Sequence, residues 1–297
     1  MKKITIFTPT YNRSNTLPKL YASLQAQDCK EFVWYVVDDG SKDNTIEYMS
    51  SIVAAESSFE VRFDTKPNGG KHTAINYALD RCYTELFFIV DSDDILTPDA
   101  ISTILKDWDK YSSSELCGIG YLRGYINTDT HIGDKYPFTY KIGNYIEVYS
   151  NQGVSGDKAE VWVTQYMKQY KFPEYQGEHF CSEGLMWVQL AMHSDMLMVN
   201  KIIYKTEYLP GGLSETGRPL RLKCPKGMID NSLMQMSTHF TLKYRFKEAM
   251  LYIVYSKFDN RNIIRILNCK YMWLVAVALV PGLSLYHYWK YKFRKYL

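Results

Sequence analysis

The stretch Leu86-Phe87-Phe88-Ile89-Val90-Asp91-Ser92-Asp93-Asp94 gives the clearest structural signal in this sequence of 297 residues. Its first five residues are all apolar, which is typical of a strand buried on both faces of a sheet. Three acids follow within four positions. In sheets built from such strands, ligands bind outside the carboxyl ends, so these acids form a candidate site.

The residues on either side of this stretch contain further predicted strands, each followed by a predicted helix. Strand-like and helix-like patterns alternate through the first 125 residues, with strands expected at 4–8, 32–37, 61–63 and 86–90, and helices at 15–27, 45–53, 71–82 and 98–111. Alternation of this kind indicates a mostly parallel sheet that is covered by helices on both faces. We therefore predict an α/β fold of the Rossmann-like type.

Polar clusters fall at successive strand or turn ends of this predicted sheet. They are Pro9–Asn12, Asp38–Asp39, Asn68–Lys71 and Asp91–Asp94. Chance could place one cluster at such a position, but four in a row indicate a shared site at one edge of the sheet.

The acids after the predicted strand 86–90 suit a hard cation. Carboxylates at alternate positions, such as Asp91 and Asp93, can converge on Mg²⁺ or Mn²⁺, which take few protein carboxylates and complete their shell with phosphate oxygens. The alternative is a helix N-cap, because Asp93 or Asp94 precedes Pro98 and a predicted helix.

Two further clusters suit a nucleotide. The carboxylate of Asp39 can accept a hydrogen bond from the imide N–H of uracil; its alternative is an Asx-type turn. The backbone N–H groups of Asn68-Gly69-Gly70 and the ammonium of Lys71 can bind phosphate. A plain turn is the alternative here, and the spacing is not that of a P-loop.

Taken in order, the motifs Thr8–Arg13, Val36–Ser41, Asn68–Lys71 and Val90–Asp94 resemble those of family 2 glycosyltransferases with a GT-A fold. The resemblance covers residues 1–125 and continues through 177–187. It implies an enzyme that transfers a sugar from a nucleotide diphosphate sugar, most often a UDP-sugar, to an acceptor hydroxyl with inversion. Such enzymes often assemble cell-surface polysaccharides or glycolipids.

The resemblance also implies roles for individual residues. The implied nucleotide-binding set is Pro9, Thr10, Tyr11, Arg13, Asp39, Asn68, Lys71, Asp91 and Ser92. Tyr11 would stack on the base. Asp93 would ligate Mn²⁺ or Mg²⁺ on the diphosphate, where the metal stabilises the leaving group.

The family needs a carboxylate that takes the proton of the acceptor hydroxyl. Glu183 occupies that place, four residues before Trp187, although Ser182-Glu183 stands where the family more commonly has Glu-Asp. Asp157 and Glu178 are rival bases, and an acid in the first turn of a helix is the structural alternative for Glu183. The candidate acceptor or lid residues are Asp157, Glu178, Trp187 and Gly212.

The C-terminal tail differs in character from the rest of the chain. Residues 271–289 carry no charge, are interrupted by Pro281-Gly282, and are followed by a basic end. Aromatic flanks and cations are typical of a membrane-interfacial or re-entrant anchor. We expect two short helices on the inner, cytoplasmic face of a membrane. A buried helical hairpin or an oligomer interface is the alternative.

Composition limits the function classes. The chain is 46% hydrophobic and 23% charged, as globular proteins are. Residues 257–297 carry a net charge of +7 and the remainder −4, so the basic character belongs to the tail and does not indicate a nucleic-acid-binding surface. Six cysteines form no Cys-x-x-Cys pair, which argues against a zinc site or a disulfide framework.

We therefore predict a GT-A domain over residues 1–215, with a nucleotide-binding half, 1–125, and an acceptor half, 126–215. A helical, membrane-associated extension over 216–297 follows. Its expected partners are a nucleotide diphosphate sugar and a saccharide or lipid-linked saccharide acceptor. The alternative is a non-catalytic nucleotide-sugar-binding or scaffold protein of a membrane assembly complex. A nucleotidyltransferase is disfavoured, because no Gly-rich signature lies near the first predicted strand.

Overall fold

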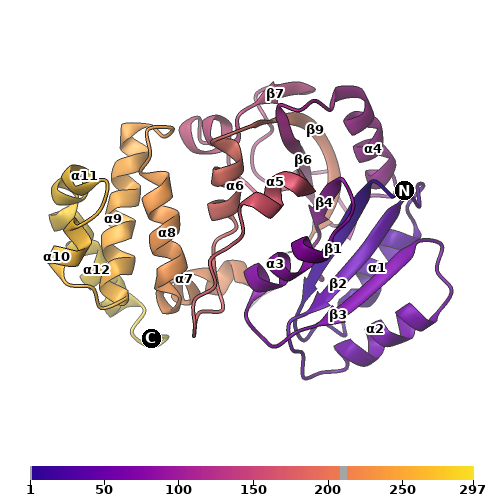
Figure 1. Ribbon diagram of the computed structural model, residues 1–297, viewed down its shortest axis with the longest axis horizontal. Helices are drawn as coiled ribbons and strands as arrows, with labels where there is room; N and C mark the ends of the chain where they lie inside the picture. Colours follow the sequence, from indigo (N-terminus) through magenta and orange to yellow (C-terminus); the bar gives the residue numbers. More distant parts are fainter. Residues whose placement is uncertain (1, 208–212) are drawn as a thin grey trace.

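The computed structural model describes residues 2–207 and 213–297. Within them, nine strands form one sheet in the order β3-β2-β1-β4-β8-β6-β9-β5, with β7 paired to β9. Figure 1 shows helices on both faces of this sheet and a second group of helices, α7 to α12, at one end of the molecule. The predicted α/β architecture is confirmed.

The first part of the chain is a parallel α/β unit, as predicted. Its elements are β1 Ile4–Thr10, α1 Leu17–Gln25, β2 Phe32–Asp38, α2 Thr45–Ala54, β3 Glu60–Thr65, α3 Lys71–Arg81, β4 Leu86–Ile89 and α4 Ala100–Tyr111. Strands β3, β2, β1 and β4 are parallel neighbours. Strand β1 runs on to Thr10, two residues further than expected.

The second part makes the sheet mixed. Its elements are β5 Ile95–Leu96, β6 Leu116–Tyr125, β7 Lys141–Gly143, the π-helix η1 Ile146–Asn151, β8 Lys158–Val163, α5 Thr164–Gln169, α6 Gly184–Ala191 and β9 Asp195–Thr206. Strand β8 lies antiparallel between β4 and β6, whereas β6 and β9 are parallel. The two parts therefore share one continuous sheet.

The two faces of the sheet hold separate apolar clusters because side chains alternate along each strand. On one face, α1, α2 and α4 cover a cluster that includes Trp34 and Phe88. On the other, α3, α5 and α6 cover a cluster that includes Phe87 and Trp162. The strand Leu86–Ile89 is buried on both faces, as its unbroken apolar run predicts.

The C-terminal helices build a cluster of their own. They are α7 Leu213–Lys223, α8 Pro225–Gln235, α9 Leu242–Phe258, α10 Ile263–Leu267, α11 Met272–Val277 and α12 Leu279–Lys292. Helix α9 lies in the middle of this group (Figure 1), and Ile253, Leu274 and Trp289 are among the buried residues of the cluster.

The predicted position of the break, Pro281-Gly282, is wrong by three residues. The helix is interrupted at Ala278, between α11 and α12. Pro281 lies in the first turn of α12, where a missing N–H costs little. Gly282 lets α12 approach α9, since a Cβ there would lie 2.8 Å from Cδ1 of Ile253.

The apolar segment 271–289 is packed along only part of its surface. Leu274 and Val275 are buried against the cluster, whereas Trp273, Val277 and Val280 are 56%, 67% and 75% exposed. Among the described residues, no helix is both long enough and apolar enough to cross a bilayer.

Candidate functional site

A cavity of about 470 Å³ lies between the two parts of the sheet and the start of α6. Its lining includes Lys71, Asp91, Arg123, Glu160, Glu183 and Trp187. Four of these, Lys71, Asp91, Glu183 and Trp187, are residues that the sequence analysis singled out. Residues more than 100 positions apart in the sequence thus meet at one place.

Lys71 is the centre of the charged network in this cavity. It is the first residue of α3, and its Nζ lies 2.6 Å from Oδ1 of Asp91 and 2.8 Å from Oε1 of Glu183. One cation therefore neutralises a carboxylate from each part of the chain. A diphosphate that binds Lys71 would compete with these two carboxylates.

Asp91 is held ionised by two cations. The guanidinium of Arg123, on β6, lies 3.9 Å from Oδ2 of Asp91. Burial by itself raises the pKa of Asp91, but the charges of Lys71 and Arg123 outweigh it and lower that pKa below its usual value. Arg123 also lies over the ring of Tyr204, 4.1 Å from its centroid. No sequence motif marked Arg123.

The other two acids of the cluster differ from each other. Asp94 is buried and accepts a 2.6 Å hydrogen bond from the hydroxyl of Tyr204. Burial and the charge of Asp91 raise its pKa to about 6. Asp93 is 32% exposed, and its nearest cationic partner is Arg13, at 4.0 Å. Helix α4 has Asp99 at its N-cap, so the capping alternative for Asp93 and Asp94 is wrong.

The residues present fit a divalent cation only in a sparse site. Among the described residues, no three metal-ligating side chains cluster. Asp93 accepts no hydrogen bond from any of them, so its oxygens keep their lone pairs. A hard cation that takes few protein carboxylates and completes its shell with phosphate oxygens matches this donor set.

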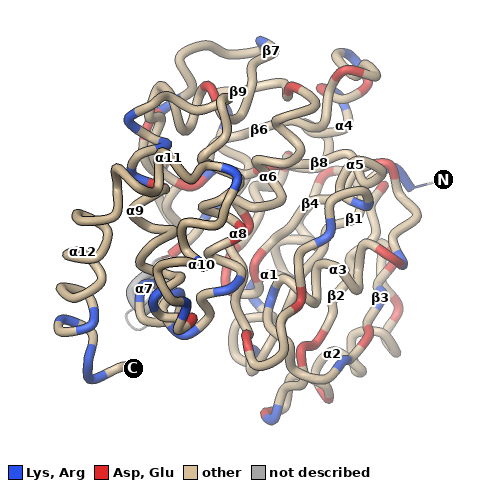
Figure 2. The backbone as a smooth tube through the Cα atoms, turned by 60° about the vertical axis from the view of Figure 1, so that its left-hand side comes forward, with Lys and Arg blue, Asp and Glu red and all other residues tan. Residues whose placement is uncertain are grey.

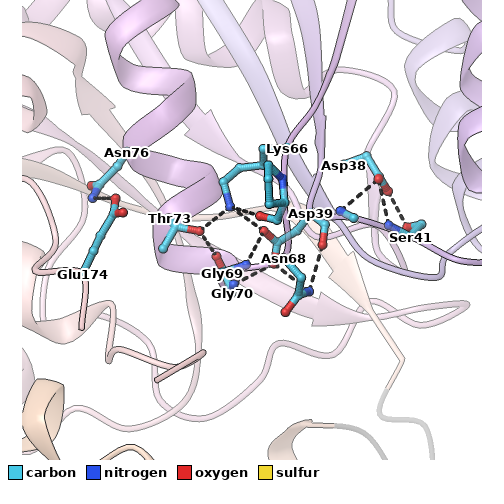
Figure 3. A network of polar contacts seen from close by, with 12 residues as sticks. Asp38, Asp39, Ser41, Lys66, Asn68, Gly69, Gly70, Thr73, Asn76 and Glu174 are labelled. Carbon is cyan, nitrogen blue, oxygen red and sulfur yellow. Dashed lines mark hydrogen bonds and ion pairs between the residues drawn. The ribbon is translucent and has the colours of Figure 1, made fainter. Parts of the chain in front are cut away.

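Asp39 lies in a dense network with the loop before α3 (Figure 3). Its carboxylate accepts hydrogen bonds from Nζ of Lys66, Nδ2 of Asn68 and the backbone N–H groups of Gly69 and Gly70, at 2.7–3.1 Å. A uracil imide would have to replace one of these four donors. The neighbouring Asp38 forms the Asx-type turn, because it accepts from the N–H groups of Gly40 and Ser41.

The loop before α3 also binds the second part of the chain. Gly70 has a positive φ of 93°, and a Cβ there would lie 2.0 Å from the carbonyl oxygen of His179. The close approach of the His179 backbone therefore requires glycine at position 70, whether or not a ligand also binds there.

The remaining predicted nucleotide residues surround this network. Pro9 and Thr10 end β1, and Oγ1 of Thr10 is buried without a hydrogen-bond partner among the described residues. Tyr11 is 43% exposed, so its ring is accessible to a ligand. Ser92 is buried.

The candidate bases occupy different positions. Glu183 is the N-cap residue of α6. Both Glu183 and Asp157 line the cavity. Glu178 instead accepts hydrogen bonds from the backbone N–H groups of Lys226 and Gly227 at the start of α8. That position gives Glu178 a structural role and disfavours it as a base.

The acceptor or lid candidates are only partly placed. Trp187 stacks on Trp162 with ring centroids 4.8 Å apart and contributes to the cavity wall. Gly212 lies outside the described residues. Glu160, on β8, is a cavity carboxylate that sequence reasoning missed.

Comparison with known proteins identifies a family for most of the chain. The family described as "Glycosyl transferase family 2" matches residues 5–195. The Pasteurella multocida (strain Pm70) chondroitin synthase is 33% identical over 107 residues, which cover 35% of this chain and 11% of that protein. A GalNAc(5)-diNAcBac-PP-undecaprenol β-1,3-glucosyltransferase of Campylobacter jejuni is 25% identical over 64% of this chain and 60% of its own length. The chain thus spans about a tenth of the first relative and less than two thirds of the second.

Solved structures share the fold. Staphylococcus aureus TarS 1–349 in complex with UDP-GlcNAc superposes with a TM-score of 0.64 at 17% identity, over 96% of this chain and 80% of that one. The mannosyltransferase PcManGT from Pyrobaculum calidifontis, in complex with GDP-Man and Mn²⁺, gives 0.58 at 14% identity, over 95% and 75%. At these identities the likeness establishes a GT-A-like fold.

Proposed function

The chain belongs to glycosyl transferase family 2, and on that premise we propose that it transfers a sugar from a UDP-sugar to an acceptor hydroxyl. One observation carries the proposal: Lys71 joins Asp91, in the acidic motif after β4, to Glu183, the candidate base, inside one cavity. Complexes of structural neighbours with UDP-GlcNAc and GDP-Man support a nucleotide sugar as donor.

The donor would bind at the carboxyl ends of the parallel strands. Tyr11 offers an exposed ring for the base. The Asp39 network fixes the loop Asn68–Lys71, and the ammonium of Lys71 exchanges its carboxylate partners for phosphate oxygens. Asp93 would hold a Mn²⁺ or Mg²⁺ ion, which supplies charge to stabilise the leaving diphosphate.

The transfer step needs one base. Glu183 takes the proton of the acceptor hydroxyl, the hydroxyl oxygen forms a bond to the anomeric carbon, and the nucleoside diphosphate leaves with the electron pair of the broken bond. A single direct displacement inverts the anomeric carbon. The configuration of the product, read from the anomeric proton coupling in its NMR spectrum, tests this mechanism; retention would exclude it.

The acceptor is proposed to be a lipid-linked saccharide at the cytoplasmic face of a membrane. The relative from Campylobacter jejuni acts on an undecaprenol-linked substrate. Trp273, Val277 and Val280 are exposed apolar residues. Arg265 lies on α10, and basic residues lie at the end of α12, where Figure 2 colours the backbone blue. Apolar surface next to cations suits anionic headgroups.

The deciding experiment is a screen of UDP- and GDP-sugars with and without Mn²⁺. We expect one donor to raise the Tm and to be hydrolysed slowly, in both cases only with the metal. Binding without any hydrolysis or transfer would favour the non-catalytic binding or scaffold protein. No binding of any nucleotide sugar would refute the proposal.

A further inference from the structure

Glu160 is a carboxylate of the cavity for which neither the sequence motifs nor the proposed reaction has a use. On β8, its neighbours Ala159 and Val161 belong to the apolar cluster on one face of the sheet. Alternation along a strand therefore places Glu160 on the opposite face. Trp162 lies on that face and stacks on Trp187 of α6, the helix that Glu183 precedes. Glu160 and Glu183 thus line the same cavity.

The hydrogen bonding of Glu160 is incomplete. Among the described residues, the only hydrogen bond to its carboxylate comes from the hydroxyl of Tyr149, at 3.3 Å. A carboxylate has about four lone-pair sites. Asp39 shows what saturation looks like in this chain, because its carboxylate has four donors. Glu160 therefore keeps capacity to accept hydrogen bonds from a ligand.

The surroundings make this incompleteness costly for a purely structural residue. Burial raises the pKa of Glu160 to about 7; Arg123 acts against this shift, and the charge of Glu183 adds to it. An under-bonded carboxylate in such a place loses solvation without full compensation. Residues of this kind concentrate at sites that bind or convert a ligand.

An aromatic surface lies beside the carboxylate. Tyr145 and Tyr149 both line the cavity, and their rings stack with centroids 4.1 Å apart. Tyr149 also shares a 2.7 Å hydrogen bond with the hydroxyl of Tyr136, which fixes its position. A ring face next to a hydrogen-bond acceptor matches a sugar, which presents C–H groups on one side and O–H donors around its edge.

We propose that Glu160 binds the acceptor sugar. It accepts a hydrogen bond from one ring hydroxyl, while Glu183 deprotonates the neighbouring hydroxyl, and Tyr145 and Tyr149 contact the ring. The ligand is a saccharide with two adjacent free hydroxyls. This assignment rests on the proposed function, and it makes Glu160 a specificity residue for the acceptor and not for the donor.

The test compares Glu160→Gln with Glu147→Gln, an exposed glutamate on η1 that lies outside the cavity lining. Both variants and the wild type are assayed with Mn²⁺ and the UDP-sugar that the screen selects. Hydrolysis is measured alone, and transfer is measured to a panel of p-nitrophenyl hexosides and N-acetylhexosaminides. Donor and acceptor KM are determined separately.

We expect Glu160→Gln to keep hydrolysis and donor KM within about 2-fold and to raise the acceptor KM about 10-fold, because the neutral amide oxygen of Gln accepts a weaker hydrogen bond than a carboxylate does. Glu147→Gln stays at the wild-type values. For an acceptor that lacks the adjacent hydroxyl, we expect the wild type to show the same raised KM as Glu160→Gln shows with the complete acceptor. Glu160→Gln should then raise the KM of the deoxygenated acceptor little further, which is the coupling expected of a direct contact.

Three results would overturn the assignment. An unchanged acceptor KM in Glu160→Gln removes the contact. An equal loss of hydrolysis and UDP binding makes Glu160 a structural or donor-side residue. Hydrolysis without transfer to any sugar of the panel retains the donor site and refutes recognition of the acceptor through a single sugar ring at Glu160. If the wild type acts on no nucleotide sugar at all, the proposed function itself fails.

Discussion

The ammonium of Lys71 lies 2.8 Å from Oε1 of Glu183 and so ties the first residue of α3 to the residue that precedes α6. The same ammonium holds Asp91 at 2.6 Å. Burial lowers the pKa of Lys71, but the two carboxylates outweigh it and raise that pKa above its usual value. Glu183, the proposed base, thus stays ion-paired until another anion binds Lys71.

Replacement of Lys71 by Met should weaken UDP binding by at least about 10-fold, because a partly buried cation that is proposed to face the diphosphate is lost. It should also lower kcat, since Asp91 and Glu183 are then left without their shared counter-ion. Titration calorimetry with UDP and Mn²⁺ measures the first effect. Lys19→Met, at an exposed ion pair with Glu207, is the matched control and should bind UDP normally.

Glu183→Gln should lower kcat by about 10²- to 10⁴-fold, the range for loss of a general base. UDP affinity should stay within a few-fold of the wild type, because the amide still fits and the base faces the acceptor. Steady-state transfer rates and UDP calorimetry separate the two quantities. A variant with near-normal kcat would move the role of base to Asp157.

Asp93→Ala should abolish the Mn²⁺-dependent rise in Tm that UDP produces, while the Tm of the free protein changes little, since Asp93 is partly exposed and makes no close contact. Asp94→Asn should do the reverse, because Asp94 is buried against Tyr204. Thermal unfolding with and without UDP and Mn²⁺ reads both variants. Full activity of Asp93→Ala in the presence of a chelator would refute the assignment of Asp93 as a metal ligand.

Gly70→Ala should destabilise the fold strongly. The substitution adds strain at φ 93° and places a Cβ 2.0 Å from the carbonyl oxygen of His179. Gly177→Ala separates the two effects, because Gly177 also has a positive φ of 81° but no atom within 4 Å of its added Cβ. We expect Gly177→Ala to cost about 1–2 kcal/mol and Gly70→Ala clearly more in denaturant unfolding. Equal losses would show that the His179 contact yields easily.

Combined replacement of Trp273, Val277 and Val280 by Ser should reduce binding to vesicles that contain anionic lipid, since these exposed side chains supply the apolar contact. Binding of the wild type should also weaken at high salt. Co-sedimentation with sucrose-loaded vesicles measures both. Ile142→Ser, an exposed residue of β7, is the control. Equal sedimentation of all variants, or none of the wild type, would contradict the membrane proposal.

The sequence predicted the parallel half of the fold because its signals are local. The apolar run before Asp91 and the helix starting at Lys71 need no distant partner to be recognised, and both elements are present. Strand β8 has no such signal: it lies antiparallel between β4 and β6, and only the assembled sheet gives it that place.

The site was predicted in part for the same reason. Motifs pointed to Lys71, Asp91 and Glu183, which the fold brings together. Arg123 and Glu160 were missed because neither belongs to a motif that the sequence analysis identified, and the proposed role of each depends on neighbours across the sheet. Glu178 was a rival base on the sequence alone, but its carboxylate caps the start of α8, almost 50 residues later in the chain.

The position of β8 between β4 and β6 also constrains how this protein can diversify or be re-engineered. A crossover in a chimeric gene anywhere between β4 and β9 would leave a central strand paired with foreign neighbours, so the segment from β5 to β9 cannot be exchanged as a module. Changes of acceptor preference are better sought by point substitutions along β8 and η1. Helices α7 to α12 share an apolar cluster, but a graft of this block would have to include Glu178, which accepts hydrogen bonds from the start of α8.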